Sequence, residues 1–385
     1  MIKTLVAYTA EVDDIETAVQ SIQAQLAGQI LTHSVGIIAC HAEFLTSGAA
    51  QAVCAALPFD VVGATTIAQA VNQECGVFLL SVTVLTSDEA VFVTKLTDPL
   101  LPEPCAAIER AYQEAAASQT GAPSLILPYA PFMVENSADE YVETLTRASG
   151  GIPCFGTIAV DDTLTFELSQ LVFNGQAYRD RMGMILVYDD IRPRFLLATI
   201  SPEKMISKEA LVTKSNRHIV QEVNGRPVRE YFADLGLLDA AAEQYAMVSL
   251  PFMLDYNDGT PKISKVFVRQ TEEGYALCAG LMPEGSTLRI GMFDKEDILL
   301  TSGQAMDQAQ AELENASGML IYSCIARSLS LGANSMVEME MVQEKTGGRV
   351  PFMMAYSGGE ICPTQVSEGQ AINRFHNNTF VACVF

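Results

Sequence analysis

The chain has 385 residues, of which 49% are apolar and 18% are charged, and its formal net charge at pH 7 is −23. This length exceeds the size at which one hydrophobic core stops growing, so we expect two domains, and the apolar content argues against disorder. Because no segment gathers Lys and Arg, we expect binding neither to nucleic acid nor to an anionic bilayer.

The sequence also bears on cellular location. The first apolar run is too short for a signal peptide, since acidic residues begin at Glu11, and no run of about 18 apolar residues predicts a transmembrane helix. The nine cysteines include no Cys-x-x-Cys pair, and most of them lie in apolar runs. We therefore expect reduced, buried thiols in a cytoplasmic protein.

One order of elements, strand then helix then strand, recurs three times along the chain. Strand–helix–strand units of this size build parallel or mixed sheets. Their continuous apolar strands are typical of sheets covered on both faces. The three predicted units are 34–40, 47–57 and 59–66; 124–130, 137–149 and 152–159; and 318–327, 335–345 and 349–361.

Between the second and third units the pattern becomes antiparallel. Asn174-Gly175 and Asn224-Gly225 are signals for type I′ hairpin turns, and a short helix is predicted at 229–235. The polar segment 201–209 is the predicted domain boundary, so the predicted domains are 1–203 and 204–385. The predicted fold class is α/β, with antiparallel hairpins and mixed sheets flanked by helices.

Standard signatures of catalysis and cofactor binding are absent. The sequence contains neither of the glycine-rich nucleotide-binding loops, no metal-binding histidine spacing and no G-x-S-x-G. No metal site and no catalytic residue are therefore predicted. A nucleophile could still form in space from Cys324 or Cys362 with His376, so a Cys- or carboxylate-dependent hydrolase is the alternative.

A sparse set of polar residues and glycines near the C-terminus is the candidate ligand site. An Arg fork can bind a carboxylate and a Glu can accept from an ammonium, so the set could hold a zwitterion such as an amino acid. Binding of such a ligand requires the side chains to converge on a solvent-accessible cavity at the carboxyl ends of strands. In the alternative, Arg327 at a strand end and Glu360 at a strand break form a structural ion pair. The set is Cys324, Arg327, Gly358, Gly359, Glu360, His376, Asn377 and Thr379.

Segments along nearly the whole chain resemble the FIST family. The first 200 residues resemble the FIST N domain through DVVGATT (60–66), IPCFGTIAVDD (152–162) and VFNGQAY (172–178). The later part of the chain resembles the FIST C domain. The segments that carry this resemblance are 211–236, FVRQ (267–270, with Arg269), MPEGSTLRIG (282–291), YSCIAR (322–327), VPFMMAYSGGEICP (350–363) and FHNNTFV (375–381). The sequence departs from the family at 356–359, where the family often has an aromatic residue and a Thr before Gly-Glu.

The resemblance implies a sensory module that binds a small ligand, with amino acids as proposed ligands. Some members of the family are linked to haem, so a haem-binding sensor with His376 or a cysteine as axial ligand is a third reading. The sequence shows no kinase, cyclase or methyl-accepting segment. We therefore expect a stand-alone module whose output requires a separate signalling partner or oligomerisation.

Overall fold

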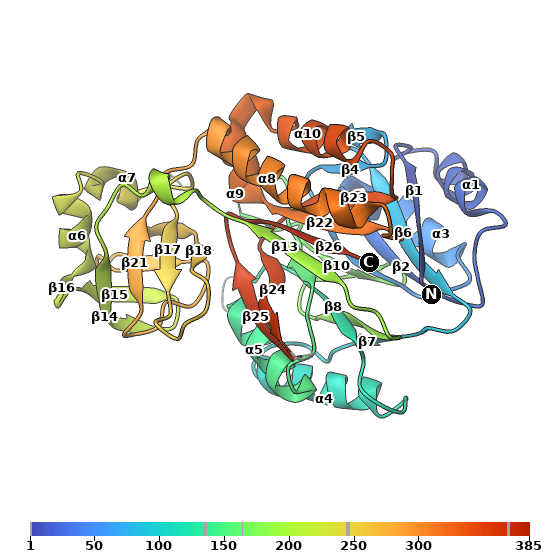
Figure 1. Ribbon diagram of the computed structural model, residues 1–385, viewed down its shortest axis with the longest axis horizontal. Helices are drawn as coiled ribbons and strands as arrows, with labels where there is room; N and C mark the ends of the chain where they lie inside the picture. Colours follow the sequence, from blue (N-terminus) through green and yellow to red (C-terminus); the bar gives the residue numbers. More distant parts are fainter. Residues whose placement is uncertain (1, 134–136, 164, 244–246, 368–369) are drawn as a thin grey trace.

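The computed structural model describes residues 2–133, 137–163, 165–243, 247–367 and 370–385. It consists of a larger body and a smaller lobe formed by residues 210–290, which projects from one end of the body (Figure 1). The body contains three six-stranded sheets, and the lobe contains a fourth sheet of its own. The α/β class with mixed sheets, predicted above, is confirmed.

The first sheet of the body has the strand order β1-β6-β2-β3-β10-β11. Three helices pack on its outer face, where their apolar side chains meet those of the strands. The strands are β1 (Lys3–Thr9), β6 (Leu80–Ser87), β2 (His33–Cys40), β3 (Val61–Thr65), β10 (Leu171–Phe173) and β11 (Gln176–Tyr178), and the helices are α1 (Ile15–Leu26), α2 (Glu43–Thr46) and α3 (Ala49–Ala55).

The second sheet has the order β25-β24-β9-β8-β12-β7 and is covered on its outer face by two helices. Its strands are β25 (Gln370–His376), β24 (Glu360–Ser367), β9 (Gly156–Ile158), β8 (Leu125–Ala130), β12 (Gly183–Tyr188) and β7 (Val91–Leu96), and its helices are α4 (Pro104–Ala116) and α5 (Ala138–Ser149).

The third sheet has the order β13-β26-β22-β23-β4-β5. Two helices cover its outer face, along the top of the body in Figure 1. Its strands are β13 (Arg194–Ala198), β26 (Phe380–Val384), β22 (Met319–Cys324), β23 (Phe352–Ser357), β4 (Gln69–Val71) and β5 (Glu74–Gly76), and its helices are α8 (Lys295–Leu313) and α10 (Val337–Thr346). The short helices η1 (Pro202–Lys204), α9 (Ile325–Leu331) and η2 (Gly332–Asn334) lie outside these layers.

The lobe is an antiparallel sheet with the order β18-β17-β21-β14-β15-β20-β19, and β16 pairs with β15. Two short helices close its separate apolar core. Its strands are β14 (Ala210–Asn216), β15 (Ile219–Val223), β16 (Arg226–Pro227), β17 (Phe252–Asp255), β18 (Ile263–Lys265), β19 (Phe267–Gln270), β20 (Ala276–Cys278) and β21 (Thr287–Ile290), and its helices are α6 (Val228–Asp234) and α7 (Leu238–Ala242).

The inner faces of the three body sheets meet in one central core. Side chains alternate along a strand, so in β8 Leu125 and Leu127 enter this core whereas Ile126 packs outward with residues of α4 and α5. Tyr322 of β22 also enters the central core, and its ring stacks on Phe155 with centroids 5.4 Å apart. Both faces of the central strands of each body sheet are buried, which explains the continuous apolar runs in the sequence.

Each body sheet contains one parallel strand pair: β2 with β3, β8 with β9, and β22 with β23. These pairs are the three predicted strand–helix–strand units. Strands from distant parts of the chain pair antiparallel with these parallel pairs and so widen the sheets. For example, β4 pairs with β23, and β24 pairs with β9. Two sheets thus combine strands from both sides of the boundary predicted at 203/204, and that boundary stays a prediction.

Both predicted Asn-Gly turns are present. Asn174 and Gly175, between β10 and β11, have φ values of 49° and 78°. Asn224 and Gly225, between β15 and β16, have φ values of 53° and 74°. Positive φ at both central residues defines the type I′ turn, whose twist suits a two-stranded hairpin.

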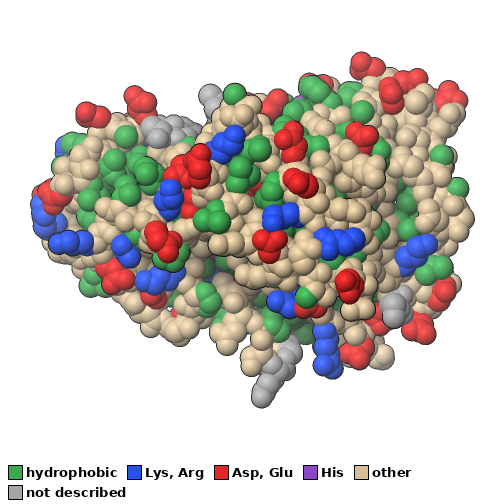
Figure 2. Space-filling model, turned by 45° about the horizontal axis from the view of Figure 1, so that its top comes forward, with side chains coloured by type: hydrophobic (Ala, Val, Ile, Leu, Met, Phe, Trp, Pro, Cys, Tyr) green, Lys and Arg blue, Asp and Glu red, His purple; other side chains and the backbone are tan. Residues whose placement is uncertain are grey.

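The surface carries charges of both signs. On the face shown in Figure 2, Lys and Arg side chains are scattered among Asp and Glu on both the lobe and the body. Within the described ranges, no helix combines the length and the apolar character needed to cross a membrane. All nine cysteines are free thiols, and seven of them are buried, as their apolar surroundings in the sequence predict.

Candidate functional site

A cavity of about 450 Å³ lies between the body and the lobe. We call it the chamber. Its walls are mainly apolar and aromatic, with a few polar side chains from both parts of the molecule. The residues that line it are Pro131, Phe132, Met133, Ser137, Ala138, Tyr141, Ile158, Thr165, Glu167 and Phe375 of the body and His218, Val268, Arg269, Leu277, Cys278 and Ala279 of the lobe.

The body's share of the chamber is positioned by the second sheet. Pro131 directly follows β8, and Ile158 ends β9, its parallel neighbour. The carboxyl ends of parallel strands are where open α/β sheets commonly place ligands, because the chain turns away there and leaves a crevice. Ser137 caps α5, which leads back from this edge, and its hydroxyl accepts from the amide of Asp139.

A buried ion pair joins the lobe to the body beside the chamber. Lys265 Nζ lies 2.7 Å from Asp139 Oδ1 and donates to the carbonyl oxygen of Phe375 at 2.8 Å. The other carboxylate oxygen of Asp139 accepts from the amide of Leu281 at 2.8 Å. Burial lowers the pKa of Lys265, and the neighbouring Asp139 opposes that change. With hydrogen bonds to both carboxylate oxygens, this pair has the geometry that buried charges require.

Gly280 leaves the space that this ion pair occupies. A Cβ atom at position 280 would lie 2.6 Å from Lys265 Nζ and 2.7 Å from Asp139 Oδ2. Both distances are shorter than real Cβ contacts, so only glycine lets the backbone approach the pair this closely.

Three ionisable side chains give the chamber its polar character. Arg269 and Glu167 are exposed at the chamber, while His218 is half-buried. Burial and the adjacent Arg217 lower the pKa of His218, which favours the neutral imidazole. Its buried Nδ1 atom has no hydrogen-bond partner among the described residues. The imidazole of His218 and the guanidinium of Arg269 can therefore both form hydrogen bonds with an acidic ligand.

A smaller cavity of about 40 Å³ adjoins the chamber, and we call it the recess. Phe132 and Ala279 line both cavities. Phe166 also lines the recess, with its ring 5.0 Å from that of Phe132 and a φ of 56°, which a bulky residue rarely adopts. The residues of the recess are Phe132, Phe166, Val248, Val266, Ala279, Cys324, Ile325, Ala326, Leu329, Gly358 and Asn377.

Three of the residues predicted from the sequence meet at this recess. Cys324 ends β22, Gly358 follows β23, and Asn377 follows β25, so the carboxyl ends of the third parallel pair reach the recess. The Asn377 side chain accepts from the amide of Val266 in the lobe at 3.4 Å. Cys324 and Asn377 are buried and Gly358 is half-buried, and their role as ligand contacts stays a prediction.

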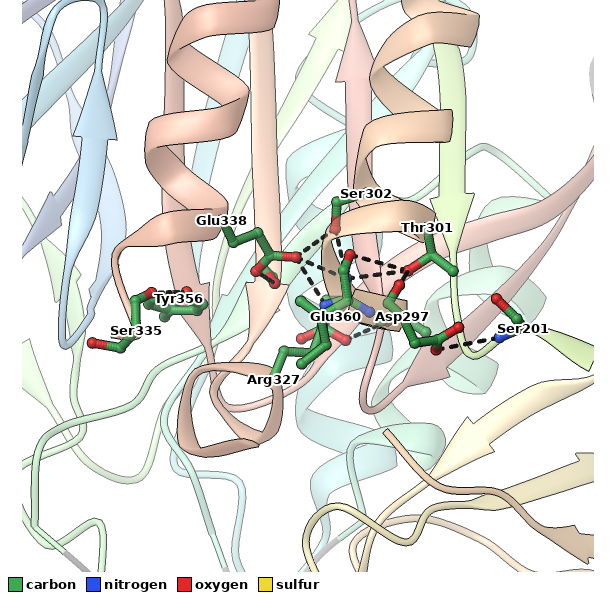
Figure 3. Close-up of polar contacts among 12 residues, drawn as sticks. Ser201, Asp297, Thr301, Ser302, Arg327, Ser335, Glu338, Tyr356 and Glu360 are labelled. Atoms are coloured by element: carbon green, nitrogen blue, oxygen red, sulfur yellow. Dashed lines mark hydrogen bonds and ion pairs between the residues drawn. The ribbon is translucent and has the colours of Figure 1, made fainter. Parts of the chain in front are cut away.

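Arg327 lies apart from the recess. The chain turns from β22 into α9 at Ile325, so Arg327 is helical and does not end a strand as predicted. Its fully buried guanidinium points between α8 and α10 (Figure 3), where Nη2 lies 2.8 Å from Glu338 Oε1 and 2.6 Å from Ser302 Oγ. Its ion-pair partner is thus Glu338 rather than Glu360, because α10 brings that carboxylate over β22.

Glu360 and Thr379 form a second buried contact, in which the Thr379 hydroxyl donates to Glu360 Oε2. Burial raises the pKa of Glu360 to about 8, although Thr379, Ser357 and Arg327 act in the opposite direction. Gly359 precedes it with a φ of 148°, and a Cβ there would lie 2.3 Å from the Phe375 ring. A glycine is therefore needed for close packing at this strand break.

His376 is also fully buried. Its Nε2 atom contacts the carbonyl oxygen of Cys362 at 3.1 Å, and burial lowers its pKa to about 3. The Cys362 thiol faces the carbonyl oxygen of Pro363, and burial raises the pKa of the thiols of both Cys362 and Cys324. Raised thiol pKa values disfavour the thiolate that a hydrolase of this kind needs.

The chamber residues Ser137, Glu167 and His218 had no distinguishing signal in the sequence. They belong to segments far apart in the chain, and packing of the lobe on the body brings them together. Arg269 did have a signal, since it lies in the FVRQ segment that carries the family resemblance. Among the residues that the structure describes, no three His, Cys, Asp or Glu side chains gather closely enough to hold a metal ion.

Comparison with known proteins identifies two adjoining domains. Residues 34–226 match the FIST N domain and residues 228–363 match the FIST C domain. No curated protein matches the chain. Among solved structures, cyanuric acid hydrolase from A. caulinodans is 13% identical with a TM-score of 0.34, over 100% of this chain and 99% of that one. PurLQS from Thermotoga maritima is 10% identical with a TM-score of 0.18, over 100% of this chain and 72% of that one.

Proposed function

The chain belongs to the FIST family, and we propose that it is a sensory module that binds a small ligand in the chamber. The observation that carries this proposal is the chamber itself. Its volume of about 450 Å³ lies in the range of small-molecule sites, and its aromatic walls with few polar groups are typical of them. Its position between two parts of the molecule gives a ligand contacts with both.

The ligand is a small amphipathic acid, such as an amino acid. Arg269 offers a planar guanidinium for a carboxylate, and the neutral imidazole of His218 offers a second hydrogen-bonding group. Glu167 offers a carboxylate for an ammonium group. The aromatic side chains of Phe132, Tyr141 and Phe375 provide an apolar surface for the rest of the ligand.

The ligand signal passes from the lobe to a separate partner protein. A ligand that touches both lobe and body favours the arrangement in which both sets of contacts are made, and it shifts the population toward that arrangement. The protein acts in the cytoplasm, which the free state of all nine thiols supports.

A thermal-shift screen of amino acids and small carboxylic acids tests this function. A ligand that binds only the folded protein raises the melting temperature through linkage. Arg269→Ala is expected to abolish the shift, whereas Lys214→Ala, which removes an exposed cation elsewhere on the lobe, is expected to retain it. A shift that survives Arg269→Ala and is lost with Arg327→Ala would place the site at the residues predicted from the sequence.

A further inference from the structure

The recess is a distinct apolar compartment next to the chamber. Aliphatic side chains form much of its wall, among them Val248, Ile325, Ala326 and Leu329. Its volume of about 40 Å³ corresponds to roughly three water-sized groups at 10–15 Å³ each. A chain of about three carbon atoms fills such a space.

The chemistry of the wall selects against a polar guest. The amide of Asn377 is the main polar side-chain group of the recess, and its oxygen is already engaged with the amide of Val266. A polar group that entered would lose its water without gaining an equivalent partner, whereas an alkyl chain would gain burial.

Two aromatic rings in contact with each other lie at the boundary between the two cavities. Phe132 lines both cavities, and Phe166 packs against it from the recess side. The left-handed backbone of Phe166, with a φ of 56°, is a strained conformation for a bulky residue. Strain of this kind persists where surrounding structure enforces it, and it concentrates at ligand clamps.

We propose that the recess takes the aliphatic tail of a ligand whose acidic head lies in the chamber. The ligand class is an α-amino or simple carboxylic acid with a short unbranched tail. This inference rests on the proposed function, since it assumes that the chamber is the ligand site. It adds a limit on the length of the ligand's aliphatic tail.

Titration calorimetry with a series of acids that differ only in tail length tests the inference. Alanine, 2-aminobutyrate, norvaline and norleucine form one series, and the corresponding simple carboxylic acids form the other. Affinity is expected to rise by about fourfold for each methylene that enters the recess, and to stop rising once the recess is full.

Two variants move this limit in opposite directions. Ala326→Val adds two carbons to the wall and is expected to shorten the preferred tail, while Leu329→Ala widens the recess and is expected to lengthen it. Leu329 is 45% exposed, so its truncation leaves the core intact. Leu300→Ala is the matched control, because Leu300 is 53% exposed on α8 and does not line the recess. This variant is expected to keep the tail-length preference of the wild-type protein.

The outcomes separate this inference from the proposed function. If acids bind and affinity does not depend on tail length, or if Ala326→Val and Leu329→Ala both keep the wild-type preference, the recess is not the tail site although the chamber function stands. If no acid of either series binds to the wild-type protein, the proposed function itself is overturned.

Discussion

The ammonium group of Lys265, at the end of β18 in the lobe, lies 2.7 Å from a carboxylate oxygen of Asp139, in the first turn of α5 in the body. Both side chains are buried, and the same ammonium group donates to the carbonyl oxygen of Phe375, a residue of the chamber wall. The ion pair thus fixes the lobe at the place where the chamber forms. The shape of the proposed ligand site depends on it.

Breaking this pair is expected to cost far more stability than breaking a surface pair. Asp139→Ala leaves a buried ammonium group without its counterion, which costs about 3–5 kcal/mol in the free energy of unfolding. Lys262→Ala, which removes a half-exposed partner of Glu209, is the control and is expected to cost about 1 kcal/mol or less. Urea denaturation of both variants provides the comparison, and equal losses would contradict the role given to Lys265 and Asp139.

Gly280→Ala tests the same contact from the side of the backbone. Its new methyl group would overlap Lys265 Nζ and Asp139 Oδ2, so we expect a loss of about 1–3 kcal/mol, as for overpacking. Gly303→Ala in α8 is the matched control, because a Cβ there meets its nearest neighbour at 3.5 Å and alanine favours the helix. Thermal or urea denaturation of both variants gives the measurement. If Gly280→Ala left the free energy of unfolding unchanged, the lobe would adjust freely around the ion pair.

Glu360 is expected to make stability fall as pH rises. Its pKa is raised from 4.5 to about 8 in the folded protein, so within that window the folded state binds a proton that the unfolded state has released. The free energy of unfolding therefore decreases with pH, by up to about 1.4 kcal/mol per pH unit, relative to Glu360→Gln. Denaturant titrations of both proteins across this window measure the difference. Parallel pH profiles would show that the Glu360 carboxyl ionises normally.

His376 is expected to make stability fall as pH decreases, which is the opposite of the effect of Glu360. Its pKa is lowered from 6.5 to about 3, so between these values the unfolded state holds a proton that the folded state lacks. Stability therefore declines as pH falls through this window in the wild-type protein, and less so in His376→Gln. The exposed His33→Gln serves as the control in the same denaturation series. A wild-type profile that His376→Gln leaves unchanged would contradict the buried, neutral state of His376.

Much of the fold follows from local sequence pattern. The apolar strands, the two Asn-Gly turns and the short helix near Arg229 are consequences of side-chain periodicity and backbone preference, which neighbouring residues determine. The structure begins that helix at Val228, one residue before its predicted start.

The candidate site depends on packing between distant segments, so little of it could be predicted. Arg327 looked like the end of a strand because apolar residues precede it, and only the position of α10 shows that Glu338 neutralises it. Glu167 and Arg269 both line the chamber although about a hundred residues separate them, and no periodicity encodes such a meeting. Cys324 and Asn377, by contrast, could be placed near one edge because they end or follow strands.

A crystal structure of the protein with the acid that gives the largest thermal shift tests the central claim most directly. We predict ligand density in the chamber, with the carboxylate at Arg269 and the apolar part extending past Phe132 toward the recess. Density for the acid at any other place, with only solvent in the chamber, would contradict the account.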